Sequence, residues 1–279
     1  MIPAAFDYEV ADSVEHALGL LGGDPDAKVL AGGHSLVPAL KLRIARPSKL
    51  VDIGGLSDLA YVRDGGTHVA IGALTRHAAV HRDPLLQEHC PIVPSTAGKI
   101  GDPQVRHRGT IGGSLAHGDP ASDLPAVMLA LGAELVIVGA GGERTVAAAD
   151  FFTGVFETAV GPGELLTEIR VPKLGDSTGW AYLKYHRRAQ DWATVGVAAL
   201  VHRDNGSAVG ASVALTSMGG TPLRAKGVED AVAGGASPAD AAAHAAEGTE
   251  PSSDTAASAE FRMHLARVLT ERALVEALA

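Results

Sequence analysis

The stretch Leu30-Ala31-Gly32-Gly33-His34-Ser35-Leu36 places two glycines and a hydroxyl between an apolar strand and a predicted helix. A second stretch, Thr110-Ile111-Gly112-Gly113-Ser114, repeats this pattern later in the chain. Backbone N–H groups can surround a diphosphate only where no side chain intervenes, and glycine permits that approach. Each stretch also offers a hydroxyl, and a helix starting at Leu36 favours an anion at its N-terminus. Together the two stretches predict a site that grips a pyrophosphate.

Other interpretations of the glycines have to be weighed. Either stretch alone is typical of an ordinary turn, because the chain contains 34 glycines, and only the pair is specific. The sequence has no G-x-x-x-x-G-K-[ST] motif, and Gly139–Arg144 lacks the last glycine of the dinucleotide fingerprint. Neither a P-loop nor a Rossmann site is therefore supported.

Short apolar strands and helices alternate through the first part of the chain. The predicted strands are Lys28–Ala31, Lys49–Ile53, His68–Ala73, Thr110–Ile111 and Glu134–Val138. The predicted helices are Val14–Leu21 with a Ser13 cap, Leu36–Arg43 and Pro125–Leu131. This alternation predicts an α+β architecture.

The pattern changes after Val171-Pro172. Tyr182–Arg188, Ala193–His202 and Val209–Ser217 are predicted strands, the last two joined by a tight turn at Asn205-Gly206. Helices follow at Arg224–Val232 and Pro238–Ala246, and a last one carries Phe261, Leu265, Val268 and Leu269 on one face. Lys173–Ser177 resembles a linker, so we predict domains at 1–175 and 176–279.

Composition narrows the function. A net charge of −9 and 4% aromatic residues argue against nucleic-acid binding. No apolar run approaches the roughly 20 residues of a membrane span, and the N-terminus lacks a secretory pattern, so we expect a soluble, cytoplasmic protein. The single cysteine, Cys90, cannot form an internal disulfide or hold an iron–sulfur cluster.

Several segments carry a resemblance to a known family. They are Leu30–Leu36 with Lys49–Ile53, Asp102–Arg106, Gly109–Ser114, Gly118–Asp123 and Pro162–Leu166. The chain resembles, over nearly its whole length, the flavin subunit of molybdenum hydroxylases of the carbon monoxide dehydrogenase and xanthine dehydrogenase type. The resemblance implies an FAD-binding domain of the p-cresol methylhydroxylase type, with subdomains at about 1–55 and 56–175. A smaller α+β C-terminal domain with an antiparallel sheet and helices would follow.

The resemblance also implies which residues contact FAD. On the pyrophosphate and ribityl chain it places Val29, Leu30, Ala31, Gly32, Gly33, His34, Ser35, Leu36, Thr110, Ile111, Gly112, Gly113 and Ser114. Asp123, Leu166 and Lys184 also match flavin contacts of the family. Each of these three has a simpler alternative, in which Asp123 caps a helix, Leu166 belongs to the core and Lys184 is solvated.

Trp192 departs from the family pattern, because members of the carbon monoxide type carry a tyrosine beside the isoalloxazine here. An indole can still shield one flavin face by stacking, although it lacks the acidity of a phenol. The alternative is that Trp192 belongs to the core.

The remaining candidates do not require a function. His77 and His81 have a possible metal-ligand spacing, but no glutamate follows His77 and further ligands are missing, so solvated helix residues are expected. Arg106, His107 and Arg108 are either surface charges or a means of steering an anion or partner. Cys90 has no base beside it in the sequence, which disfavours nucleophilic catalysis.

The resemblance implies an electron-transfer function without catalytic residues in this chain. A large partner subunit would hold the molybdenum cofactor, a small partner subunit would hold [2Fe-2S] clusters, and the whole would form a dimer of heterotrimers. This chain would take electrons from the clusters at its FAD and pass them to a terminal acceptor. The alternatives are a stand-alone FAD-dependent oxidase or reductase, and an assembly subunit with a vestigial nucleotide site.

Overall fold

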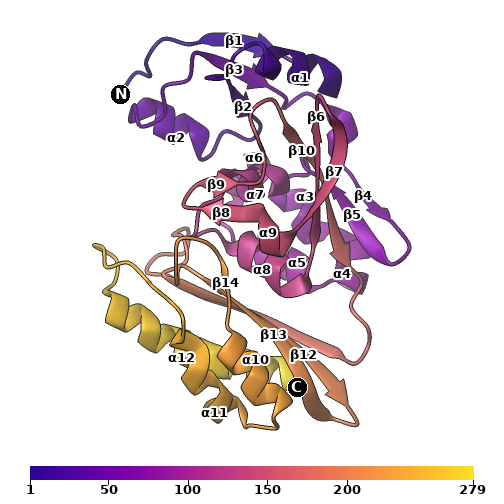
Figure 1. The fold of residues 1–279 in the computed structure, drawn as a ribbon, viewed down its shortest axis with the longest axis vertical. Helices are drawn as coiled ribbons and strands as arrows, with labels where there is room; N and C mark the ends of the chain where they lie inside the picture. The colour runs from indigo at the N-terminus through magenta and orange to yellow at the C-terminus, as the bar shows by residue number, and fades with distance from the viewer.

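A computed structural model describes all residues, 1–279, in three layers along the long axis of the molecule (Figure 1). The first layer is a parallel sheet in the order β1-β3-β2, formed by β1 (Asp7–Val10), β2 (Lys28–Leu30) and β3 (Lys49–Asp52). Helices α1 (Val14–Gly22) and α2 (Leu36–Lys41) connect these strands. Ser13 caps α1 as expected, because its side chain accepts a hydrogen bond from the His16 N–H.

The middle layer contains a five-stranded sheet whose neighbouring strands are all antiparallel, in the order β4-β5-β10-β6-β7. Its strands are β4 (Val62–Asp64), β5 (His68–Gly72), β6 (Glu134–Gly139), β7 (Gly142–Ala147) and β10 (Leu165–Pro172). Two small strands, β8 (Phe152–Gly154) and β9 (Glu157–Thr158), form a separate hairpin. Strand β10, the last of these strands in the sequence, lies at the centre of the five-stranded sheet, between β5 and β6.

The middle layer also contains short helices, some of which pack on its sheet and others on one another. They are η1 (Ser57–Leu59), α3 (His77–Arg82), α4 (Pro84–His89), α5 (Ile92–Gly98), α6 (Pro103–Arg108), α7 (Ile111–His117), α8 (Asp123–Leu131) and α9 (Ala148–Phe151). Every residue of α8 is buried, so this helix is apolar all round and occupies the centre of the molecule.

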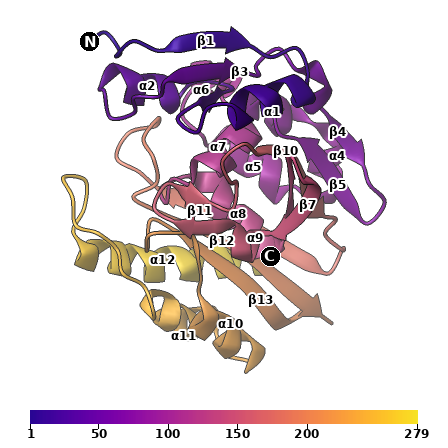
Figure 2. The same ribbon diagram turned by 45° about the horizontal axis from the view of Figure 1, so that its top comes forward.

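The last layer is an antiparallel sheet in the order β11-β12-β13-β14, with helices on its outer face (Figure 2). It comprises β11 (Thr178–Tyr185), β12 (Val195–Asp204), β13 (Ser207–Thr216) and β14 (Leu223–Arg224). The helices are α10 (Lys226–Ala233), α11 (Pro238–Ala242), η2 (Ala243–Ala246) and α12 (Ala259–Leu278).

Both faces of β12 are buried from Val195 to Val201, which explains the continuous apolar run there. One face of β12 packs in the core between the C-terminal sheet and its helices. This face carries the side chains of Val195, Val197, Ala199 and Val201. Ala198 and Leu200 point the other way, into the core of the middle layer. The C-terminal sheet therefore joins the two cores instead of lying apart on a linker.

The predicted α+β architecture and the hairpin at Asn205-Gly206 are confirmed. Three local predictions were wrong. The strand predicted to reach Arg188 ends at Tyr185, and Thr110–Ile111 is no strand, because Thr110 caps α7 and Ile111 begins it. Phe261 is 41% exposed, so the buried face of α12 is formed by Leu265, Leu269 and their neighbours without it.

No helix of the structure has both the length and the apolar character needed to cross a membrane.

Candidate flavin site

The first glycine stretch is an open loop between β2 and α2. Gly33 has a φ of +78°, a left-handed conformation that glycine adopts without strain. The N–H groups of Gly32, Gly33, His34 and Ser35 have no acceptor within the protein, and the Ser35 hydroxyl makes no capping bond. Successive free N–H groups of this kind can form a concave anion-binding surface, so the loop is able to receive a phosphate.

The second glycine stretch is not a loop but the first turn of α7. The Thr110 hydroxyl accepts a hydrogen bond from the Gly113 N–H at 3.1 Å, while the Ile111 and Gly112 N–H groups donate to the carbonyls of Thr75 and Ala73. These donors are therefore already paired, contrary to the expectation that both stretches offer free N–H groups. What this stretch still offers is the exposed backbone of Gly113 and the Ser114 hydroxyl, which has no partner.

The two stretches lie against each other. A Cβ atom on Gly32 would overlap the carbonyl of Arg108 and lie 2.9 Å from the Cα of Gly109, just before α7 begins. A Cβ atom on Gly113 would lie 4.0 Å from the Cβ of Ala31. Glycine is thus required at position 32 because two backbones pack closely, whereas the sequence interpretation attributed it to the ligand. The same packing places the free N–H groups of the Gly32–Ser35 loop beside the first turn of α7.

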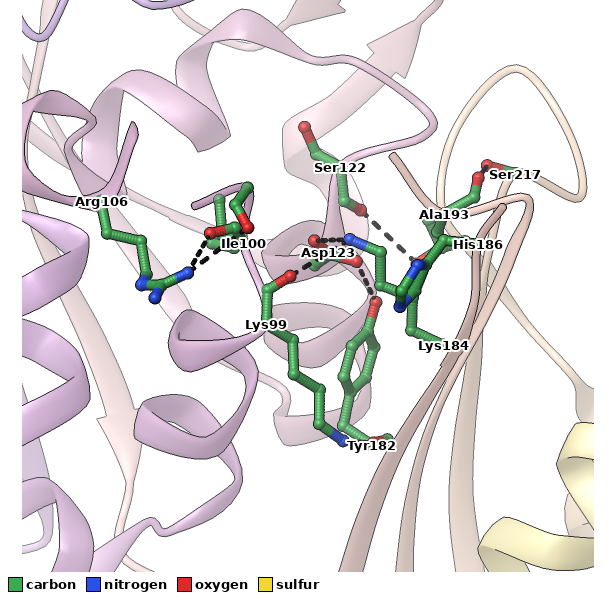
Figure 3. Close-up of polar contacts among 12 residues, drawn as sticks. Lys99, Ile100, Arg106, Ser122, Asp123, Tyr182, Lys184, His186, Ala193 and Ser217 are labelled. Atoms are coloured by element: carbon green, nitrogen blue, oxygen red, sulfur yellow. Dashed lines mark hydrogen bonds and ion pairs between the residues drawn. The ribbon is translucent and has the colours of Figure 1, made fainter. Parts of the chain in front are cut away.

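Asp123 and Lys184 meet at the junction of the middle and C-terminal layers (Figure 3). Asp123 begins α8, Lys184 lies on β11, and the Lys184 ammonium Nζ is 2.9 Å from the Asp123 Oδ2. The Lys184 and Asp123 side chains are only 2% and 6% exposed. The alternative that Lys184 is solvated is therefore wrong. The alternative that Asp123 only caps a helix is also wrong, because Ser122 is the N-cap residue of α8 and the Asp123 carboxylate pairs with Lys184 of the C-terminal layer.

Tyr182 and Lys99 complete this junction and were not singled out from the sequence. The Tyr182 hydroxyl donates to the Asp123 Oδ1 at 2.6 Å, and Lys184 also donates to the Lys99 carbonyl at 3.3 Å. Lys99 in turn donates from its ammonium to the Tyr182 carbonyl. The available signal was the two-residue spacing of Tyr182 and Lys184, which puts both side chains on one face of a strand.

The electrostatics of this junction follow from its burial. Burial raises the pKa of Asp123, and the Lys184 ammonium and the Tyr182 phenol oppose part of that rise. Burial and the neighbouring Asp123 carboxylate also raise the pKa of Tyr182 well above its ordinary value. The phenol therefore stays protonated and remains a hydrogen-bond donor.

The last two predicted contacts lie in different surroundings. Leu166 is buried in β10 within the core of the middle layer. Trp192 lies in the loop between β11 and β12, a few residues after Lys184 in the sequence, and is 64% exposed. An exposed indole is not part of the core, so the core alternative for Trp192 is wrong.

His77 lies beneath the glycine stretches. It is only 4% exposed, and its Nδ1 has no hydrogen-bond partner, so the expectation of a solvated residue is wrong. Burial, helped by Arg106, Arg76 and His34, lowers the pKa of His77 to about 4. His81 is exposed, and its ring nitrogen bonds the Pro94 carbonyl at 2.9 Å.

This buried histidine predicts acid sensitivity. Unfolded His77 titrates near 6.5 and folded His77 near 4, so between these values only the unfolded chain binds the proton. Stability is unaffected above pH 6.5 and falls by about 3 kcal/mol as the pH drops towards 4. We expect urea denaturation of His77→Leu to show a shallower loss over this window, with exposed His202→Leu as the control. An unchanged slope in His77→Leu would show that other groups cause the acid sensitivity.

The side chains of the other candidates make no hydrogen bond or ion pair with the predicted flavin contacts. Arg106 donates to the Ile100 carbonyl at 2.8 Å. His107 and Arg108 line a surface hollow of about 440 Å³ together with Arg76, Ala78, Ala79 and Arg82, and this hollow contains no predicted flavin contact. Burial raises the pKa of the Cys90 thiol to about 12, so it carries no thiolate near neutral pH.

The fold and the site together define a protein with an open glycine loop, able to receive a phosphate, that lies beside the first turn of α7 in the middle layer. Residues 4–174 match the family of the FAD binding domain in molybdopterin dehydrogenase, and residues 180–277 match the CO dehydrogenase flavoprotein C-terminal domain. The chain belongs to this family of FAD-binding subunits of molybdenum hydroxylases. The α+β fold implied by the resemblance, with a flavin domain followed by an antiparallel C-terminal domain, is thereby confirmed.

The similarity to individual relatives extends over the full length of the chain. The carbon monoxide dehydrogenase medium chain of Afipia carboxidovorans is 43% identical, covering 100% of this chain and 99% of the relative. The 6-hydroxypseudooxynicotine dehydrogenase complex subunit alpha of Paenarthrobacter nicotinovorans is 42% identical, covering 100% and 96%. A solved carbon monoxide dehydrogenase from Hydrogenophaga pseudoflava, which lacks the Mo-pyranopterin moiety of its cofactor, superposes with a TM-score of 0.96 at 42% identity, covering 99% and 98%.

Proposed function

We propose that this chain binds FAD by its diphosphate at the Gly32–Ser35 loop and relays electrons within a molybdenum hydroxylase. The observation that carries the proposal is the set of free N–H groups at Gly32, Gly33, His34 and Ser35, which lies beside the first turn of α7. A diphosphate placed there would satisfy these donors. When bound, FAD supplies the ability to accept electrons singly and release them in pairs.

The remaining predicted contacts extend this site towards the domain junction. Helix α7 runs from the glycine stretch at Ile111 to His117, and α8 then begins at Asp123, so one short segment links the diphosphate end to the Asp123–Lys184 pair. We place Val29–Leu36 and Thr110–Ser114 on the diphosphate and ribityl chain. Asp123, Leu166, Lys184 and Trp192 are the contacts that we assign to the flavin end.

The proposed partners are a large molybdenum subunit and a small iron–sulfur subunit, in a cytoplasmic dimer of heterotrimers. The two relatives above have nearly equal identity to this chain although their names refer to different substrates. This is expected if the substrate binds in another subunit. A single cysteine likewise leaves the iron–sulfur clusters to a partner. We propose that the flavin and C-terminal domains divide near residue 175.

The decisive test is an absorption spectrum of the purified chain, isolated alone and with its native partners, followed by chromatography of the released chromophore. Released FAD together with molybdenum and iron in the co-isolated material is the expected result. FAD without a metal-containing partner would instead indicate a stand-alone flavoenzyme. A colourless chain that does not take up added FAD would indicate a vestigial site.

Trp192 gives a separate prediction about the flavin end. If its indole stacks on the bound flavin, Trp192→Leu should raise the fluorescence of bound FAD, because a stacked indole quenches flavin emission by electron transfer. Trp180, the only other tryptophan, packs on the core of the middle layer and provides the control as Trp180→Leu. Equal emission from wild type and Trp192→Leu would remove Trp192 from the site.

A further inference from the structure

Tyr182 is a buried phenol with a single strong acceptor. The side chain is 1% exposed, and its hydroxyl donates to the Asp123 carboxylate at 2.6 Å (Figure 3). A hydrogen bond to a charged group in a buried site is stronger than an ordinary one, and it withdraws negative charge from the acceptor. The effective charge of Asp123 therefore depends on this hydroxyl.

The position of the hydroxyl is fixed from both domains. Tyr182 lies on β11 in the C-terminal layer, whereas Asp123 begins α8 in the middle layer. A Cβ atom on Gly196 would lie 2.7 Å from the phenol oxygen, so glycine there leaves space for the ring to reach Asp123. The Lys99 ammonium donates to the Tyr182 carbonyl and lies 5.6 Å from the centre of its ring. The phenol has little freedom to move away.

Lys184 is the third member of the hydrogen-bonded network around Asp123. Its ammonium is held by the Asp123 Oδ2 at 2.9 Å and by the Lys99 carbonyl at 3.3 Å. An ammonium has three donor hydrogens, so one remains for a further acceptor. Loss of the phenol would leave both charges in place and would alter only how strongly the carboxylate is neutralised.

We propose that Tyr182 is a positioning residue of the flavin site, which holds the Asp123 carboxylate and so sets the electrostatic environment in which the flavin is reduced. The proposal rests on the function proposed above. Reduction adds negative charge to the flavin, and a less neutralised carboxylate in a low-dielectric site opposes that addition. The Tyr182 hydroxyl therefore makes the bound flavin easier to reduce.

The test compares midpoint potentials and visible spectra of the FAD-loaded full-length chain. Tyr182→Phe should shift the midpoint potential to more negative values while FAD remains bound. Tyr61→Phe is the matched control, because the Tyr61 hydroxyl also donates to a buried carboxylate at 2.6 Å, but this carboxylate belongs to Glu168 on β10 and not to the Asp123–Lys184 pair. Its potential should equal that of the wild type.

A second variant keeps the proposal testable if Tyr182→Phe does not fold. Tyr182→3-fluorotyrosine preserves the shape of the ring and makes the phenol a stronger donor, so its potential should shift in the opposite direction. Potentials and spectra that match the wild type in both Tyr182 variants, with only a lower denaturation midpoint, would overturn the proposal and leave Tyr182 a structural residue. Failure of the wild-type chain to bind FAD would overturn the proposed function instead.

Discussion

Asp123→Leu is expected to destabilise the protein by about 3–5 kcal/mol, because it leaves the Lys184 ammonium buried without its counter-ion. The Tyr182 hydroxyl would lose its acceptor as well. The double variant Asp123→Leu/Lys184→Met should recover most of this loss, since replacing a whole buried ion pair with apolar groups of similar volume is often nearly neutral. Urea denaturation followed by tryptophan fluorescence measures all of these changes.

The control for this cycle is an exposed ion pair. Glu9 pairs with Lys49 at 2.6 Å on the surface of the N-terminal sheet, with the Glu9 side chain 43% exposed. Glu9→Gln should leave the denaturation curve almost unchanged, because solvent screens such pairs. If Asp123→Leu were as mild as Glu9→Gln, the junction of the middle and C-terminal layers would not depend on the buried Asp123–Lys184 pair.

Ser114→Asp should weaken FAD binding by roughly a hundredfold, or about 3 kcal/mol, because it places a carboxylate beside the diphosphate. Ser114 lies in the first turn of α7, where an acidic side chain stabilises a helix. Loss of FAD in this variant is therefore not expected to result from unfolding. The measurement is titration of the flavin-free chain with FAD, together with the FAD retained after gel filtration.

Ser114→Asn is the matched variant, since asparagine has the size of aspartate without its charge. It should bind FAD nearly as well as the wild type. Equal loss in the two variants would indicate a steric effect, and equal retention would place the diphosphate away from α7. Equal retention would contradict the assignment of the phosphate to this position, whereas equal loss would contradict the expected charge effect.

Part of the candidate flavin site could be predicted from the sequence because its geometry depends on residues that are close in the chain. A left-handed Gly33, a hydroxyl at Ser35 and a helix starting at Leu36 all follow from residues that are neighbours in the chain. The same argument misjudged the second stretch. Its N–H groups are paired with Ala73 and Thr75, which are distant in sequence and become neighbours only when the middle layer folds.

The elements of the C-terminal domain were likewise predictable from alternation and from the Asn205-Gly206 turn, but their environment was not. The run Val195–Val201 predicts a buried strand without indicating what covers each face. In the structure, one face packs in the C-terminal core and the other in the core of the middle layer. A lysine on the neighbouring strand β11 can consequently be buried, because the covering layer supplies Asp123.

The sequence by itself therefore determined the α+β class, the open glycine loop after β2 and the family, since each depends on short-range patterns of glycine, hydroxyl and apolar residues. Only the tertiary structure decided that Gly32 serves the packing of two backbones, that His77 is buried and uncharged, and that Asp123, Tyr182 and Lys184 form one network. The physical reason is that burial, charge pairing and close backbone approach are properties of pairs of segments. Such pairs are far apart in the chain and meet only when the layers pack.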